Sequence, residues 1–127
     1  MQITQKPTDS ELEILQILWK NGPSTVRQVN DQISEKKDVV YTTTLKLMQI
    51  MAEKKLVKRE KSGKSHIYSA AVKENETKNL LLDKFLENAF AGSASKLVLQ
   101  ALGNHKASKE ELDQIRELID TIERGLK

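Results

Sequence analysis

Apolar residues recur at helical spacing in three short segments near the start of the chain, which predicts three helices. The expected helices cover residues 9–20, 25–35 and 41–54. Thr8 and Glu11 are spaced as a capping box before the first helix, and Ser24 is expected to cap the second. The inward-facing stripes are Leu12, Leu15, Leu18 and Trp19 on the first helix, Val26, Val29 and Ile33 on the second, and Thr44, Leu47, Met48 and Met51 on the third.

A β-hairpin is expected directly after the third helix. Residues 56–60 and 66–70 are the predicted strands, and residues 61–65 between them form a polar turn with one glycine. A helix-turn-helix followed at once by a hairpin describes a winged helix, in which the second helix of the pair enters the major groove of DNA.

From residue 73 onwards the pattern is helical only. Ser108 and Glu111 form another capping box before the last helix. The expected helices cover residues 76–89, 94–102 and 109–124. We therefore expect a mainly α fold with a small β-hairpin. It combines a winged helix-turn-helix domain at residues 1–72 with a helical dimerisation domain at residues 73–127.

Basic residues are concentrated in one segment of the first half. The formal net charge is +3, but residues 46–64 alone hold seven basic and two acidic residues. Such an excess is expected where a polyanion docks. The candidate DNA-binding residues carry hydroxyl, amide or cationic groups that can reach bases or phosphates. They are Ser24 and Thr25 at the start of the second helix, Thr42, Thr43, Lys46 and Gln49 on the third, and Arg59, Lys61 and Lys64 in the hairpin.

The C-terminal helices are short and sparsely apolar, so their apolar stripes need a partner surface. We expect a second copy of the chain, because a dimer reads a palindrome and one compact reader rarely makes enough contacts for tight binding. Packing against the winged-helix domain is the alternative. The candidate dimerisation residues are Leu81, Phe85, Leu97, Leu112, Ile115, Ile119 and Ile122.

Several segments resemble the BlaI/MecI/CopY family, the penicillinase and methicillin-resistance repressors. Pro7–Trp19 has the capped acidic start and the Leu-Trp end, and Tyr41–Met51 is followed by the similar run Glu53–Val57. The hairpin that ends in Tyr68, the region around Lys96–Leu99 and the last helix are also similar. The resemblance therefore covers nearly the whole chain.

The resemblance implies a homodimeric repressor on a palindromic operator whose halves are similar to TACA and TGTA. It also implies a membrane metalloprotease sensor that triggers cleavage within the dimerisation domain. Gln100-Ala101 stands where the β-lactam-responsive members have the cleaved Asn-Phe bond, and the chain lacks the cysteine motif of the copper-responsive branch. Val40-Tyr-Thr-Thr43 replaces a Ser-Pro-Lys-Thr helix start, so base preference does not transfer.

The sequence disfavours an enzyme, a metal site, a cofactor and a small-molecule substrate. His66 and His105 lie far apart, and no nucleophile or phosphate-loop motif is found. The chain shows no signal peptide and no apolar run of membrane-spanning length, and with no cysteine we expect it in the cytoplasm. Two alternatives stay open: a winged helix acting mainly through protein–protein interaction, and a regulator controlled by a small ligand. Only five aromatic residues are present, which argues against a large ligand pocket.

Overall fold

The computed structural model describes residues 6–126 and divides into two compact units. The first unit ends at Leu82 and the second begins at Asp83. This division lies inside α4 (Glu74–Phe90), further along the chain than the boundary expected after Val72. The first turns of α4 belong to the first unit, where Thr77 is fully buried.

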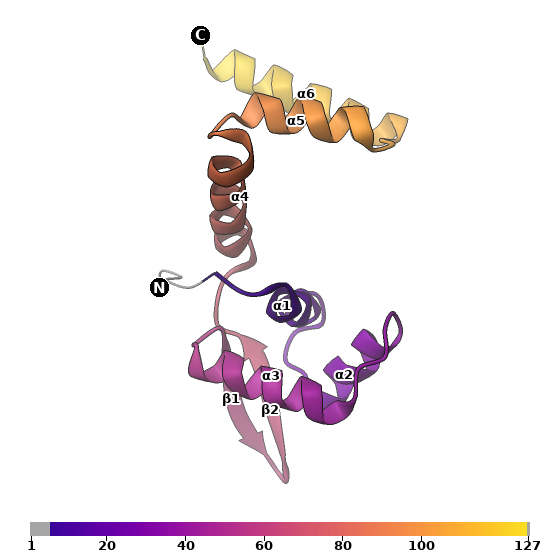
Figure 1. The fold of residues 1–127 in the computed structure, drawn as a ribbon, viewed down its shortest axis with the longest axis vertical. Coiled ribbons are helices and arrows are strands. Elements are labelled where there is room, and N and C mark those ends of the chain that lie inside the picture. The colour runs from indigo at the N-terminus through magenta and orange to yellow at the C-terminus, as the bar shows by residue number, and fades with distance from the viewer. Residues whose placement is uncertain (1–5, 127) are drawn as a thin grey trace. The chain divides into compact units, whose positions relative to one another are not determined.

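The first unit has the predicted element order of a winged helix (Figure 1). In Figure 1, α3 crosses in front of the hairpin and its N-terminal end lies beside α2. The mainly α fold with a small β-hairpin is therefore confirmed. The elements are α1 (Asp9–Asn21), α2 (Val26–Ser34), α3 (Tyr41–Glu53), β1 (Val57–Ser62) and β2 (Ser65–Ala70).

The core of the first unit lies where the three helices meet the base of the hairpin. Its side chains are apolar and nearly inaccessible to water, and burial of this kind is the main driving force for folding. The predicted inward stripes supply most of it, while Leu12, Trp19 and Leu47 are only half-buried. The buried core residues are Ile14, Leu15, Leu18, Val26, Val29, Ile33, Met48, Met51, Leu56, Val57 and Tyr68.

Trp19 and Glu11 make long-range polar contacts that tie α1 to the rest of this unit. The indole N–H of Trp19 donates to the carbonyl of Val72 at 3.0 Å, which fixes the segment that leads into α4. Glu11 accepts from the Thr8 N–H at 2.9 Å, which confirms the predicted capping box, and from the Lys54 ammonium at 2.8 Å. Burial alone would raise the pKa of Glu11, but the Lys54 and Thr8 hydrogen bonds hold it below its usual value.

The expected cap of α2 was wrong by one residue. Thr25 is the cap, and it forms a capping box with Gln28. Ser24 instead forms a backbone bridge to β2, in which its N–H donates to the Tyr68 carbonyl at 2.9 Å and its carbonyl accepts from the Tyr68 N–H at 2.8 Å. This bridge joins the hairpin to the start of the helix-turn-helix, so Ser24 takes part in the sheet and cannot begin a helix.

The hairpin turn is shorter than predicted. The strands pair from Val57 with Ala70 to Ser62 with Ser65, which leaves a two-residue turn where five residues were expected. Gly63 occupies the first turn position with a φ of 63°, a left-handed conformation that two-residue hairpin turns require and that glycine adopts without strain.

The second unit contains the end of α4 and the helices α5 (Ala94–Asn104) and α6 (Lys109–Gly125). The expected break at Gly92 and Ser93 and the capping box of Ser108 with Glu111 are both present. The predicted α4 was two residues too short at its start and one at its end, and the predicted α5 was two residues too short at its end. No helix among residues 6–126 is both long and apolar enough to span a bilayer.

Candidate nucleic-acid interface

A buried polar network holds the start of α3 against α2. The side-chain amide of Asn30 donates to the carbonyl of Val39 at 2.9 Å and to the hydroxyl oxygen of Thr44 at 2.8 Å. Thr44 is fully buried, so its hydroxyl needs a partner inside the fold. Val40 provides no side-chain cap for α3, as the sequence predicted. The hydrogen bonds from Asn30 therefore hold the N-terminal end of α3 in place against α2.

The four polar residues predicted to face DNA are exposed on one side of α3. Thr42, Thr43, Lys46 and Gln49 all lie outside the core, while Thr44, Met48 and Met51 form the buried side. Residues 41–52 contain no acidic side chain. The exposed side of α3 therefore offers hydroxyl, amide and ammonium groups from Thr42 to Gln49, and the carboxylate of α3, on Glu53, stands at the C-terminal end of the helix.

The two faces of the hairpin carry different groups. Directly paired residues point to the same face, and Arg59 pairs with the buried Tyr68 while Lys61 pairs with His66. Arg59, Lys61 and His66 therefore lie on the face that turns towards the helices. Lys58 pairs with Ser69 on the opposite face. All four are exposed, and the alternation places Arg59 and Lys61 on one face and Lys58 on the other.

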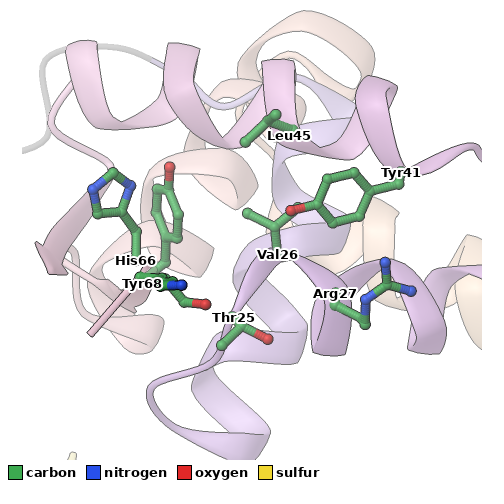
Figure 2. Close-up of a pocket in the computed structure, with 9 residues that line it drawn as sticks. Thr25, Val26, Arg27, Tyr41, Leu45, His66 and Tyr68 are labelled. Carbon is green, nitrogen blue, oxygen red and sulfur yellow. The ribbon is translucent and has the colours of Figure 1, made fainter. Parts of the chain in front are cut away.

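A cavity of about 340 Å³ lies between the start of α2, the start of α3 and the hairpin (Figure 2). Arg27, Lys64 and His66, all of basic residue types, line it, and among the residues that the structure describes no carboxylate does. The guanidinium of Arg27 lies 5.3 Å from the centre of the Tyr41 ring, a cation–π distance that orients the arginine. Figure 2 shows Arg27 and Tyr41 on one side and His66 and Tyr68 on the other.

Ser24 and Thr25, both predicted to contact a phosphate, differ in the accessibility of their hydroxyl groups. Ser24 is 4% exposed and its hydroxyl donates to the Gly22 carbonyl at 2.9 Å, so the expectation that Ser24 offers its hydroxyl and N–H to DNA was wrong. Thr25 lines the cavity. Its oxygen accepts from the Gln28 N–H at 3.2 Å, which leaves the hydroxyl hydrogen free to donate.

Sequence reasoning missed Arg27 and Tyr41. A signal was present: Arg27 stands in the first turn of α2, where the helix dipole favours an anion over a cation. A cation at such a place is more useful for binding an external anion than for helix stability. The cavity also has a Tyr68 wall, and the hydroxyl of that buried tyrosine has no hydrogen-bond partner among the described residues.

The second unit exposes an apolar surface instead of enclosing a core. No residue of Ala94–Asn104 or of Lys109–Gly125 is buried. Of the predicted dimerisation residues, Leu81, Leu97, Leu112 and Ile115 are half-buried. Phe85, Ile119 and Ile122 are at least half exposed, at 52%, 50% and 54%. Gln100 and Ala101 are exposed within α5.

A model of the penicillinase repressor family matches residues 7–121. This chain belongs to the penicillinase repressor family. The penicillinase repressor of Staphylococcus aureus is 25% identical over 113 residues, which cover 89% of this chain and 90% of the relative. The transcriptional regulator BlaI of Mycobacterium tuberculosis is 27% identical over 119 residues, which cover 92% of this chain and 85% of the relative.

The solved structure of Bacillus licheniformis BlaI, a monomeric form in complex with the blaP half-operator, has the same fold as the first unit. Its TM-score is 0.52 at 20% identity, and the match covers 60% of this chain and 93% of that one. The predicted family and the winged-helix fold are therefore confirmed, and the chain is a DNA-binding repressor of transcription by family.

Proposed function

We propose that this repressor binds a two-fold symmetric operator as a homodimer, with α3 of each copy in the major groove and each hairpin on the flanking backbone. The exposed polar side of α3, which holds no carboxylate before Glu53 at the helix end, carries the proposal together with the basic cavity and the basic hairpin face beside it. Thr42, Thr43, Lys46 and Gln49 read bases or contact the adjacent phosphates. The cytoplasm, where bacterial DNA is found, is the compartment that this function requires.

The cavity between α2, α3 and the hairpin is suited to a backbone phosphate. Thr25 at the N-terminus of α2 supplies a hydroxyl donor, and Arg27 and Lys64 supply positive charge from two sides. A helix N-terminus adds a favourable dipole for an anion. The Arg27–Tyr41 contact reduces the side-chain entropy that binding would otherwise cost.

The homodimer is proposed because the second unit cannot bury its own apolar side chains. Phe85, Ile119 and Ile122 remain half exposed beside acidic and basic residues that stay in water, which is the pattern of an interface. We favour a second copy of the chain as the partner, because a two-fold symmetric operator presents two half-sites on the same face of B-DNA. The two half-sites lie roughly 34–36 Å apart, which is one helical turn.

The charged residues of the hairpin provide a matched test of this interface. Arg59→Ala should weaken binding to all duplexes and reduce the salt dependence by about one phosphate contact per chain. Lys58→Ala removes the same charge from the opposite face and should change affinity far less. Fluorescence anisotropy with a palindromic TACA/TGTA duplex and a scrambled duplex, across a salt series, measures both. Equal losses for the two variants would contradict the proposed orientation of the hairpin.

Release from DNA by proteolysis is the second part of the proposal, with a membrane metalloprotease sensor as the partner that starts it. Gln100 and Ala101 are exposed in α5, a helix without buried residues. Local unfolding of α5 into the extended conformation that a protease binds therefore requires little free energy. A cut there would remove α6 and with it Ile119 and Ile122. A chain that ends at Gln100 should then be monomeric in sedimentation and bind one half-site weakly. If it stays dimeric with unchanged affinity, the proposed consequence of cleavage is wrong.

A further inference from the structure

Ile50 is a half-buried apolar side chain on α3 that does not serve the core. Leu45 and Leu47 on the same helix pack against the buried core, but among the described residues Ile50 is not one of the side chains that do so. It lies one turn beyond Lys46 and two turns beyond Thr43, on the side of α3 that faces away from Met48. The exposed part of its apolar surface is therefore free for another contact.

A shallow open hollow surrounds this side chain. Thr42, Thr43, Lys46, Leu47 and Ile50 line it, and its surface is mainly apolar. Three of these five residues, Thr42, Thr43 and Lys46, also belong to the side of α3 assigned to DNA. The hollow is therefore continuous with the proposed reading face, and Lys46 at its rim favours a negatively charged partner.

We propose that this hollow receives the C5-methyl group of an operator thymine. The proposal rests on the proposed DNA interface and adds a specific mode of reading to it. The thymine methyl is the apolar group that the major groove of B-DNA displays, and apolar side chains read it by contact. The methyl group of Thr43 and the side chains of Leu47 and Ile50 thereby select a T·A pair, while hydrogen bonds from the neighbouring polar groups select other bases.

The expected effect follows from the size of one methyl group. Removing a methyl from a closed apolar contact changes affinity by about fourfold. Replacing thymine by deoxyuridine removes only this methyl and keeps every hydrogen-bonding group of the base pair. The substitution therefore isolates the contact.

The test begins with selection of duplexes by the full-length repressor from a random-sequence pool. Each thymine of the selected duplex is then replaced singly by deoxyuridine, and affinity is measured by fluorescence anisotropy. One or two positions in each half-site should lose about fourfold in affinity, and the others should change little. Affinity that stays within about 1.5-fold at every position would overturn the proposal while leaving the operator itself established. A pool without an enriched sequence would contradict the proposed function and this reading together.

Two variants of α3 connect the methyl effect to the hollow. Ile50→Ala and the smaller change Thr43→Ser should each bring the thymine-to-deoxyuridine affinity ratio at the responsive positions close to one. Gln49→Ala, on the polar side of α3, should lower the affinity for both duplexes and keep the ratio. Thermal unfolding followed by circular dichroism checks that each variant is folded. An unchanged ratio in both folded hollow variants would overturn the proposal.

Discussion

The two units of this chain use their apolar residues in opposite ways. In the first unit, Leu15 and Met48 are fully buried, and a capping box and the Asn30 network give the buried Glu11 and Thr44 hydrogen-bond partners. In the second unit, Ile119 and Ile122 are half exposed and neither α5 nor α6 has a buried residue. The first unit encloses a buried apolar core, whereas the apolar side chains of α5 and α6 remain partly exposed. This difference is the reason why we propose DNA reading for the first unit and pairing of copies for the second.

Disrupting the exposed apolar surface should have the largest effect on function. Ile119→Lys places a charge in the proposed dimer interface, where it would be buried without a partner. We expect monomers and a loss of operator affinity of about 10²- to 10⁴-fold, because the two reading heads no longer act together. The thermal unfolding of the first unit should change little. If Ile119→Lys binds a two-half-site duplex with the affinity of the wild type, the exposed apolar surface of the second unit is not needed for operator binding.

Truncating a core residue should have the reverse pattern. Leu15→Ala removes a fully buried side chain and should lower the free energy of unfolding of the first unit by about 2–5 kcal/mol. Urea unfolding measures the loss. At urea concentrations well below the transition the variant should remain dimeric, because the second unit is unchanged. If Leu15→Ala is instead monomeric under these conditions, dimer formation depends on the first unit, and the proposed division between the units is wrong.

The sequence predicts local structure in this chain better than it predicts contacts between segments. Periodicity and capping boxes identified the helices, since both signals lie within a few residues of the structure that they specify. The cap of α2 was misplaced because Ser24 and Thr25 are both suitable caps, and the bridge from Ser24 to Tyr68 decides between them. This bridge joins segments that are distant in the sequence.

The candidate site shows the same limit. The polar residues of α3 follow from helical spacing, and the structure leaves them exposed. Arg27 and Tyr41 stand on different helices, so their contact depends on the angle between α2 and α3. The free surface of Ile50 depends on where the core of the first unit ends. Neither could be inferred from local patterns.

A smaller effect concerns the pH dependence of the first unit. The pKa of Glu11 in the folded protein lies below its usual value of 4.5, so the stability that Glu11 contributes is fully present above this value. It is lost as the pH falls through the lower folded-state pKa. Glu11→Gln should cost about 1–3 kcal/mol at neutral pH. Its difference from the wild type in urea unfolding should shrink as the pH falls below about 4.5.

Glu13→Gln is the matched control for this pH effect. Glu13 pairs with Lys37 at 2.8 Å, but the two side chains are 38% and 51% exposed, so water screens the pair. This change should cost about 0–1 kcal/mol at neutral pH. A cost for Glu13→Gln equal to that for Glu11→Gln would mean that the buried position of Glu11 confers no advantage.

Sedimentation of the full chain, alone and with a selected two-half-site duplex, tests the division of labour most directly. The account predicts a free species of twice the 14.4 kDa mass of one chain and a complex with two chains on each duplex. Ile119→Lys should sediment as one chain when free. A full-length protein that remains monomeric at micromolar concentration and binds the duplex as a single chain would contradict the account.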